Sequence, residues 1–503
     1  MTKDKETKNL VSKEDKVPFK SKLAYAAAGP VDVLGIWVLV SIAYQVFNME
    51  LKMPPTYVAI ILMSLRLWDG ILDPIMGWIS DNTRTKWGRR RPFIFVGAII
   101  AGLLYPLIWW FPTDFSQLQI MFWVIGFGIL FYTFFTIWGI PYQSLLMEMT
   151  PNYYERTRVA EVRSYFQTVA GFVNGWIWWL SMLPVFWIVK DGVEVASPIN
   201  GMRYISMIIG GLIIVLGILP AIFLKERYYE SDVVQNQKKI LFISGLKETF
   251  SNKPFIILSL LTVFFLMGQA IFDGYGRYVG TYYVLGGDWN EGAKFAGYGT
   301  IVYTVFSLMF IPIFRKLSEK IGKKKVLMIS IGLAIISYAT TWWTFVPGEM
   351  WVPLETPYGF FGYTISAMPG KPFLMLLNTV FIGAGYAGLW LMLPSMQVDI
   401  VDYDELKNGE RREGSFASIY SWVLKLSFVI GFLISGPLLE ITGFDANIGN
   451  IQPDYVYTNM RIGFLVIPLV ALTIAFILLQ SFPITAKKAK EIRQQLEERR
   501  GKV

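Results

Sequence analysis

Long apolar stretches, separated by short polar or charged segments, dominate the pattern of hydrophobic and polar positions along the chain. A helix needs about 20 mostly apolar residues to cross a lipid bilayer. Read with that template, the sequence predicts an all-α membrane protein with twelve transmembrane helices. The predicted spans are residues 23–47, 56–80, 92–111, 118–148, 159–188, 204–224, 254–285, 294–314, 325–345, 372–399, 415–442 and 461–483.

The composition agrees with a chain that lies in a lipid bilayer. Hydrophobic residues make up 54% of the 503 residues and charged residues 17%, whereas soluble domains are about 25% charged. The sequence contains no cysteine and no histidine. It therefore has no disulfide or thiolate metal site, and any proton chemistry falls to Asp, Glu, Lys or Tyr. The first 22 residues lack the apolar core of a signal peptide, so we expect a tail there.

The placement of basic residues predicts the orientation. Of the 46 Lys and Arg residues, 37 lie in one alternating set of loops and tails, and only six lie in the opposite loops. The basic set comprises residues 1–22, 81–91, 149–163, 225–253, 315–325, 400–414 and 484–503. Because basic loops stay in the cytoplasm, we expect both termini there. The net charge of +9 is then explained without a nucleic-acid partner.

The second half of the chain echoes the first. "KWGRRRPF" follows the second span and "KIGKKKVL" follows the eighth, while "PNYYERTRVAE" and "KNGERREGSFA" follow the fourth and tenth. We therefore predict two pseudo-symmetric six-helix halves, as in many secondary transporters. The alternative is that basic clusters recur only because positive charge stays inside. The predicted parts are the tail 1–22, the halves 23–224 and 254–483, the cytoplasmic linker 225–253 and the tail 484–503.

Charged residues inside the second span are the first candidates for a site. In "RLWDGILDPIMGWI", Asp69 and Asp73 stand one helical turn apart and share a face. Each charge costs about 2.5–3.5 kcal/mol at a helix centre by insertion scales. Two such acids can bind Na⁺ through their oxygens, or either can carry a proton, so we predict a cation-coupling site. The alternative is a static network in which Arg66 neutralises Asp69.

Other ionisable residues within the predicted spans are Asp32, Arg163, Asp273, Arg277 and Lys425. Intramembrane charges usually face the interior of a helix bundle and mark pathways. Lys425 would hold the two acids ionised when the cation is absent. For Asp273 and Arg277, four residues apart, we expect a static ion pair. The indole of Trp390 can stack on a sugar ring, and simple core packing explains it equally well.

At "DGILDPIMGWISDNTRTKWGRRRPF" the sequence resembles the glycoside–pentoside–hexuronide:cation symporters, the melibiose-permease type within the major facilitator superfamily. Their second helix carries Asp-x-x-x-Asp-Pro-x-x-Gly, and a basic loop ending in Trp-Gly-x-x-(Arg/Lys)-Pro follows it. "KLAYAAAGPVDVLGI", "TIWGIPYQSL" and "LWLMLPSMQVDIVDYDELKNGERREGSFASIYSWVLK" resemble the first, the fourth, and the tenth and eleventh helices. The similarity covers both halves and implies the major facilitator superfamily fold.

The resemblance also implies roles for single residues. It assigns cation coupling to Asp69, Asp73, Thr136 and Lys425, and substrate binding to Asp32, Arg163, Trp390 and the position of Gln143. Three positions depart from the melibiose type. Gly139 replaces a second sugar-binding aspartate, Gln143 replaces a tryptophan, and Leu72 replaces an asparagine. We therefore do not expect an α-galactoside substrate, while another sugar, glycoside or uronide stays open, as does Na⁺ against H⁺.

Together these features predict a secondary active transporter that symports a sugar with Na⁺ or H⁺ by alternating access. We expect a monomer in a bacterial inner membrane, with no cofactor and no metal apart from Na⁺ at Asp69 and Asp73. The predicted cytoplasmic gating loops contain Arg84, Arg89, Arg90, Arg91, Asp402 and Arg411. The alternatives are a transporter of a lysolipid or amphiphilic anion, and a membrane scaffold or sensor. An enzyme is not expected, because the sequence has no Gly-x-Ser-x-Gly, P-loop or metal-ligand cluster.

Overall fold

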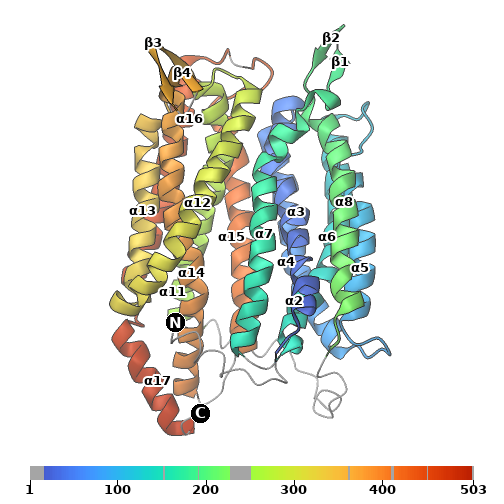
Figure 1. The fold of residues 1–503 in the computed structure, drawn as a ribbon, viewed down its shortest axis with the longest axis vertical. Helices are drawn as coiled ribbons and strands as arrows, with labels where there is room; N and C mark the ends of the chain where they lie inside the picture. The colour runs from blue at the N-terminus through green and yellow to red at the C-terminus, as the bar shows by residue number, and fades with distance from the viewer. Residues whose placement is uncertain are drawn as a thin grey trace. The chain divides into compact units, whose positions relative to one another are not determined.

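A computed structural model describes residues 16–150, 153–190, 192–226, 251–360, 363–408, 413–449 and 451–500. Within these residues, twelve long helical segments correspond one for one to the predicted spans (Figure 1). Helices are the expected form for apolar segments, because a helix satisfies its own backbone hydrogen bonds in lipid. The mostly helical fold confirms the predicted class.

The contacts between residues divide the chain into two compact units. Unit 1 consists of Met1–Met53 and Ser64–Ile240, and unit 2 consists of Pro54–Met63 and Leu241–Val503. The division falls within the second long helix, whose first residues are counted with unit 2.

Unit 1 contains the helices of the first six predicted spans. They are α2 (Phe19–Ala26), α3 (Gly29–Ala43) with the π-helix η1 (Tyr44–Glu50), α4 (Pro55–Asn82, from Ser64 on), α5 (Arg91–Leu104) with the 3-10 turn η2 (Pro106–Ile108), α6 (Gln117–Met149), α7 (Tyr153–Ser181) and α8 (Pro198–Phe223). Glycines let these helices approach closely. A Cβ atom on Gly97 of α5 would lie 2.6 Å from the Trp138 nitrogen of α6.

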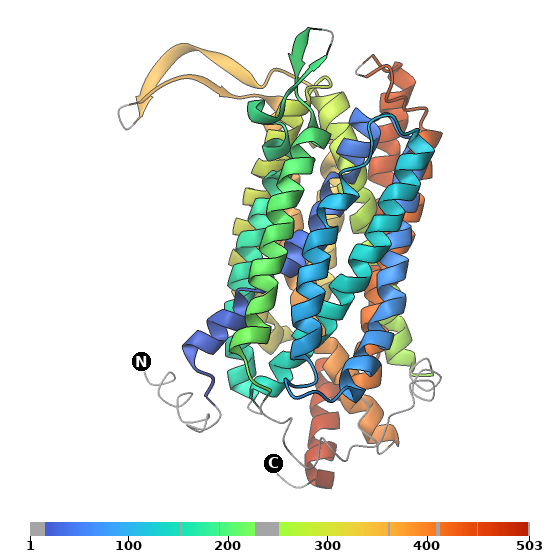
Figure 2. The same cartoon turned by 90° about the vertical axis from the view of Figure 1, so that its right-hand side faces the viewer.

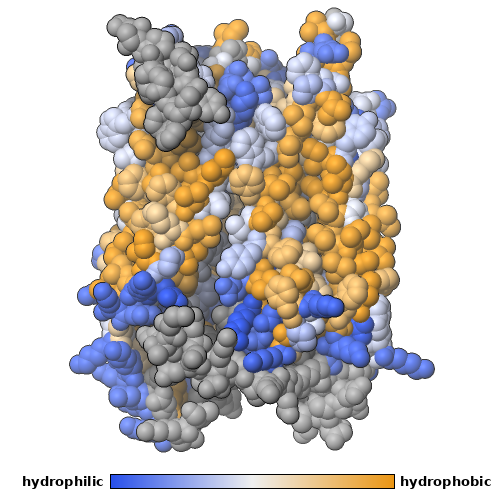
Figure 3. All heavy atoms as spheres, in the orientation of Figure 1, coloured by the Kyte–Doolittle hydropathy of each residue, from blue (hydrophilic) through white to orange (hydrophobic). Residues whose placement is uncertain are grey.

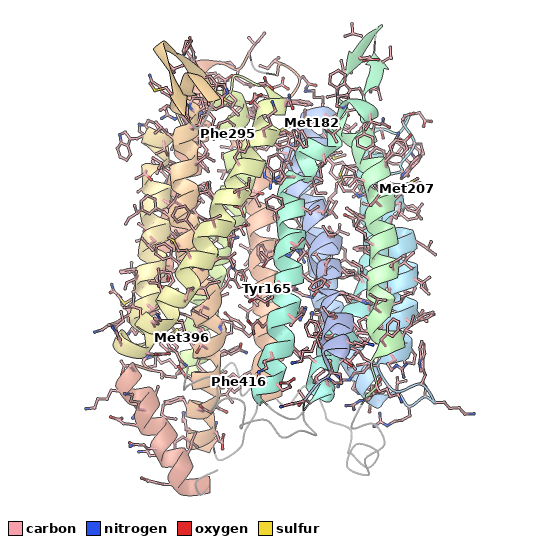
Figure 4. The ribbon with its side chains drawn as sticks, in the orientation of Figure 1. Tyr165, Met182, Met207, Phe295, Met396 and Phe416 are labelled. Atoms are coloured by element: carbon pink, nitrogen blue, oxygen red, sulfur yellow. The ribbon has the colours of Figure 1, made fainter. Side chains whose placement is uncertain are left out.

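Unit 2 contains the helices of the last six spans and one further helix. They are α11 (Lys253–Tyr278) with the π-helix η4 (Val279–Val284), α12 (Trp289–Ile321), α13 (Lys323–Thr344), the 3-10 turn η5 (Lys371–Leu374), α14 (Met375–Asn408), α15 (Glu413–Ile441), α16 (Asp454–Gln480) and α17 (Ala486–Arg500). Phe295, Met396 and Phe416 are buried in its packing (Figure 4). Gly385 and Gly388 on α14 face Ser330 of α13 at close range.

The surface of the helices suits a lipid environment. Apolar side chains cover the outer faces of the helices of each unit, and hydrophilic residues gather near helix ends (Figure 3). Among the described residues, ten helical segments are long and apolar enough to cross a membrane, and α4 and α7 are not among them. Those two carry Arg66, Asp69 and Asp73, and Glu155 and Arg163. The less apolar helices are therefore the ones that carry most of the predicted site charges.

Two β-hairpins were not predicted. β1 (Ile188–Lys190) pairs with β2 (Val193–Val195), and β3 (Trp351–Phe360) pairs with β4 (Tyr363–Pro369), both antiparallel. The 3-10 turn η3 (Pro184–Phe186) precedes β1. The second hairpin occupies the long loop between α13 and α14 and extends away from the ends of these helices (Figure 2). The hydropathy template detects only apolar segments long enough to cross a membrane, so it gives no signal for strands outside those segments.

Helix ends also differ from the predicted span ends. α12 runs to Ile321 and α14 to Asn408, well beyond the predicted ends at 314 and 399. Their last turns are charged, so the helix continues after the apolar stretch that defined the span. The first span is interrupted between α2 and α3 by a turn at Ala27 and Ala28, just before Pro30.

Candidate functional site

The candidate cation site is centred on the Asp69 carboxylate, between α4 and α6. Thr136 of α6 donates a hydrogen bond from its Oγ1 to Asp69 Oδ1, with 3.2 Å between the atoms. Arg66 Nη1 lies 3.6 Å from Asp69 Oδ2. Asp69 and Thr136 are each only 3% exposed, and Arg66 is 5% exposed. The structure therefore brings together two residues that the family motif assigned to one site, and it places Arg66 beside Asp69, as the alternative of a static network also expects.

Close packing of α4 on α6 produces this arrangement. A Cβ atom on Gly128 would lie 2.5 Å from Leu65 Cδ2, so only glycine allows the helices to approach at this level. One turn further along, Trp68 Nε1 donates to Thr133 Oγ1 at 2.9 Å. On both helices the residues that make these contacts precede Asp69 and Thr136, within about one turn on α4 and about two turns on α6. The register of the two helices thus places the hydroxyl opposite the carboxylate.

Asp73 lies one turn beyond Asp69 and is half-buried. The next residue, Pro74, stands inside α4 and has no backbone N–H, so it cannot bond the carbonyl of Gly70. That carbonyl lies between the two acids along the chain and is a further oxygen that can face a cation. Within the described residues, no group of three or more acidic side chains is placed to hold a metal ion. A bound Na⁺ would therefore need hydroxyl or carbonyl oxygens besides the carboxylates.

Arg66 is held in place by aromatic rings. Its guanidinium carbon lies 5.0 Å from the centroid of Trp37 on α3 and 6.0 Å from that of Tyr132 on α6. Guanidinium groups bind the faces of such rings at these distances. The position of Arg66 beside Asp69 therefore depends on three helices of unit 1.

The candidate substrate group is centred on Asp32 of α3. Its Oδ2 accepts hydrogen bonds from Arg163 Nη2 and, at 3.2 Å, from Gln167 Nε2, both on α7. The side chains of Asp32 and Arg163 are 14% and 19% exposed, so solvent still reaches the pair. Gly29 makes this contact possible, because a Cβ atom there would lie 3.2 Å from Arg163 Cγ and from Gln167 Cγ.

Two tyrosines complete this group. The Arg163 guanidinium carbon lies 5.1 Å from the ring centroid of Tyr142 on α6, which stacks on the ring of Tyr25 at 4.7 Å. Tyr142 donates its hydroxyl to the Tyr25 carbonyl at 2.9 Å. Sequence reasoning missed Gln167, Tyr25 and Tyr142. The only available signal was that Gln167 follows Arg163 by one helical turn.

The remaining predicted site residues lie at exposed or half-buried positions on three helices. Gln143 is exposed on α6, next to Tyr142. Trp390 on α14 is 42% exposed, and Lys425 is half-buried on α15. Trp390 and Lys425 belong to unit 2, so their participation in either group of unit 1 stays a prediction.

Three of the four arginines of the predicted gating loop in unit 1 bind one carboxylate through their backbone. The backbone N–H groups of Arg89, Arg90 and Arg91 donate to Glu226 at 2.9, 2.8 and 3.1 Å. Arg91 also donates from Nε to the Ala221 carbonyl at 2.7 Å. Glu226 therefore caps the beginning of α5 and ties it to the end of α8. Arg84 is the exposed member, and its Nη1 donates to the Thr83 carbonyl at 2.9 Å.

The corresponding region of unit 2 contains a side-chain ion pair. Lys323 Nζ lies 2.6 Å from Asp399 Oδ1 and donates to the Ser395 carbonyl at 3.0 Å. Asp402 lies near enough for its charge to act on Asp399. Arg411, the last predicted gating residue, lies outside the described residues.

Glu155, in the first turn of α7 and ahead of the predicted span, anchors the chain before α2. It receives a hydrogen bond from the Val17 N–H at 3.1 Å, and Lys22 Nζ and Arg158 Nη1 approach its oxygens at 2.6 and 3.2 Å. Burial alone would raise the pKa of Glu155. The hydrogen bonds from Lys22, Val17 and Arg158 and the charge of Lys22 outweigh that effect and hold its pKa below the ordinary value.

Long apolar helices with ionisable groups inside them, arranged in two compact units, define a multi-pass membrane transporter. The chain belongs to the family of MFS/sugar transport proteins, which matches residues 25–486. This confirms the resemblance that the second-helix motif indicated.

Several relatives of this chain are symporters or carriers. The chain is 26% identical to an uncharacterised symporter of Synechocystis, covering 96% of this chain and 98% of the relative. It is 25% identical to the sodium-dependent lysophosphatidylcholine symporter 1 of Gallus gallus (95% and 89%) and 22% identical to the glucuronide carrier protein homolog of Escherichia coli (87% of each).

Solved structures share the fold. A bacterial homologue of the human lysosomal transporter Spinster, in an inward-facing and occupied conformation, superposes with a TM-score of 0.65 at 13% identity. The match covers 93% of this chain and 97% of that chain.

Proposed function

We propose that this protein is a cation-coupled symporter of a sugar, either a glycoside, a pentoside or a hexuronide, that works by alternating access. The observation that carries the proposal is the buried Asp69 carboxylate, hydrogen-bonded by Thr136 and neutralised by Arg66 inside an apolar helix bundle. A carboxylate so placed is costly as scaffold, because hydrophobic packing there would stabilise the fold as well or better. A carboxylate that releases and binds a cation in each cycle explains why it is there.

In the proposed cycle, Na⁺ or H⁺ binds at Asp69 and Asp73, with the Thr136 hydroxyl as a further oxygen. Lys425 would neutralise the Asp69 and Asp73 carboxylates when the cation leaves, as the family motif implies. The membrane potential contributes about 2.3 kcal/mol per charge per 100 mV. Because tenfold in concentration corresponds to about 1.4 kcal/mol, one cation would sustain roughly fiftyfold accumulation of a neutral sugar.

Asp32, Arg163 and Gln167 suit the hydroxyl groups of a sugar. The carboxylate accepts hydrogen bonds from hydroxyls, and the guanidinium and amide donate to them. Both side chains of the Asp32–Arg163 ion pair remain partly accessible, so sugar hydroxyls can form hydrogen bonds with the exposed atoms of both. Gly139 on α6 has open space where a Cβ atom would stand, so the residue that replaces the second aspartate leaves room for another sugar. Gln143 and Trp390 are proposed to border the substrate.

A second candidate substrate is a lysolipid. It is favoured by one observation, the 25% identity to a sodium-dependent lysophosphatidylcholine symporter over 95% of this chain. The family match and the similarity to a glucuronide carrier homologue support the sugar instead. We propose a monomer in a bacterial inner membrane with both termini in the cytoplasm, where Arg84–Arg91 and the Lys323–Asp399 region act as gates.

Uptake by energised membrane vesicles tests the proposal. The labelled panel consists of methyl β-D-glucuronide, D-xylose, methyl α-D-glucoside and lysophosphatidylcholine, each with and without Na⁺ and with and without a proton uncoupler. Cation-driven accumulation of one sugar supports the proposal and identifies the ion. Accumulation of lysophosphatidylcholine alone would move the second candidate to first place, and no accumulation of any solute would contradict both.

A further inference from the structure

A second polar group lies on α11 in unit 2, apart from the residues assigned above. Gln269, Asp273 and Arg277 follow one another at intervals of four residues, so their side chains share one face of the helix. The Gln269 amide donates a hydrogen bond to the Asp273 carboxylate, and the charge of Arg277 acts on it. Asp273 lies in the last third of α11 and Arg277 in its last turn, in a helix whose other residues are mostly apolar.

Three tyrosines from three other helices surround Asp273. Tyr303 on α12, Tyr338 on α13 and Tyr386 on α14 each lie near enough for their hydroxyls to sense its charge. The hydroxyls of Tyr338 and Tyr386 are hydrogen-bonded to each other. The ring of Phe272 stacks on Tyr338 with 4.3 Å between the centroids. These three tyrosines and Phe272 all belong to unit 2, as Asp273 does.

The exposure of Asp273 shows that this face of α11 is accessible to solvent at that position. Thr262 and Leu266, on the same face two to three turns earlier, are 0% exposed, whereas Asp273 is exposed and Arg277 is half-buried. Ile256 and Leu260, the exposed apolar residues of α11, lie on a different side of the helix at about 100° per residue. An Asp side chain is not expected to open toward lipid. The exposed side chain of Asp273 is therefore in contact with water.

The side chains of this polar group are of the same kinds as those of the Asp32 group. Each unit presents one Asp with one Arg and one Gln near it and a tyrosine close by. The Asp–Arg pair has no net charge, so it suits a neutral ligand whose hydroxyls both donate and accept hydrogen bonds. A quaternary ammonium group is disfavoured, because Arg277 would repel it. A purely structural ion pair would be expected to have its carboxylate packed away from water.

We propose that Gln269, Asp273 and Arg277 form a second hydroxyl-binding subsite that contacts a neutral part of the transported sugar. The subsite replaces the static ion pair that the sequence suggested, and it rests on the proposed sugar transport. Asp273 accepts from sugar hydroxyls, and Arg277 and Gln269 donate to them, while Tyr303 offers an apolar ring edge.

Transport kinetics test the subsite directly. Asp273→Asn should raise the KM for whichever panel sugar the wild type accumulates by about tenfold or more, because hydrogen bonds to charged groups contribute about 1.5–3 kcal/mol. Asp273→Glu should recover part of the affinity. The cation concentration that half-activates uptake should change less than twofold, since the subsite does not bind the cation. Glu291→Gln, which removes an acid paired with Lys294 at the start of α12, is the matched control and should keep the wild-type KM.

Thiol labelling gives an independent test, because the natural chain has no cysteine and a single introduced cysteine reports alone. Gln269→Cys should react with a charged, water-soluble thiol reagent, and the transported sugar should slow that reaction. Thr262→Cys, on the same face but fully buried, should not react. An unreactive Gln269→Cys, or one that no panel sugar protects, would overturn the subsite, as would protection by lysophosphatidylcholine alone.

The failures of the two proposals are distinguishable. If wild-type vesicles accumulate no sugar, the proposed function fails and the subsite fails with it. If the wild type accumulates sugar and Asp273→Asn keeps the wild-type KM, only the subsite fails. If Asp273→Asn does not fold, the labelling and protection of Gln269→Cys decide between the outcomes.

Discussion

Glu226 offers the clearest energetic prediction, because one carboxylate accepts three backbone N–H groups at the beginning of α5. The donors are Arg89, Arg90 and Arg91, at 2.9, 2.8 and 3.1 Å. Arg89 and Arg90 are only 8% and 7% exposed, so water cannot fully replace the carboxylate. The first N–H groups of a helix otherwise lack partners, and the positive end of the helix dipole adds to the attraction.

We expect Glu226→Ala to destabilise unit 1 by about 2–3 kcal/mol. Loss of a helix cap costs about 0.5–2 kcal/mol, and we expect a value at or above the upper end of that range because three part-buried donors lose their partner at once. For a unit of this size, about 2 kcal/mol corresponds to roughly 4–8 °C in melting temperature. Glu226→Gln keeps the acceptor oxygen and loses the charge, so its effect should be smaller.

The assay is thermal unfolding of the purified protein in detergent, followed by intrinsic tryptophan fluorescence. Glu161→Ala is the matched control, because Glu161 is an exposed residue of α7 that accepts only from the Tyr165 hydroxyl, at 3.1 Å. Tyr165 is itself exposed (Figure 4), so this control should have the melting temperature of the wild type. If Glu226→Ala also melts within a degree or so of the wild type, the capping argument is wrong.

Three further predictions concern the site and the termini. Thr136→Val removes the hydroxyl that donates to Asp69, so the cation concentration for half-maximal uptake should rise about tenfold, measured at saturating sugar; an unchanged value would exclude this hydroxyl from the cation site. Because the pKa of Glu155 is depressed in the folded protein, its stabilising contacts are present above the ordinary carboxyl pKa and are lost as the pH falls through the lowered value. Melting temperature against pH should therefore drop on the acid side, and Glu155→Gln should flatten that drop; identical profiles would refute it. Gly139→Asp should fold with the wild-type melting temperature, because no atom lies within 4 Å of the new Cβ position, and a large loss of stability would contradict the open space there.

Much of the fold could be predicted from the sequence, for a physical reason. A bilayer requires long apolar helices, so hydropathy locates them, although α4 and α7 are less apolar than the others and several helices end some residues away from the predicted limits. The hairpins β1–β2 and β3–β4 could not be found this way, because they lie outside the apolar runs. The long ends of α12 and α14 were missed because charged residues continue those helices after the apolar stretch stops.

The candidate site was predicted in part. The spacing of Asp69 and Asp73 pointed to a cation site, and the family motif paired Asp69 with Thr136. Glu226 and Gln167 were missed, because their partners are distant in the chain and neither residue stands in a motif. In the sequence, Glu226 is one of several acidic residues in a polar linker, yet in the structure it accepts hydrogen bonds from residues about 135 positions earlier. Such contacts depend on how helices pack, which periodicity does not report.

The most direct test of cation coupling compares two activities of the same variants, Asp69→Asn and Asp73→Asn. Vesicles are assayed for cation-driven accumulation of the transported sugar and for exchange of labelled against unlabelled sugar without a gradient. The account predicts that both variants lose accumulation and that at least one retains exchange, because sugar binding does not need the coupling carboxylates. Cation-driven accumulation at the wild-type level in both variants would contradict the central claim that these acids couple the cation to transport.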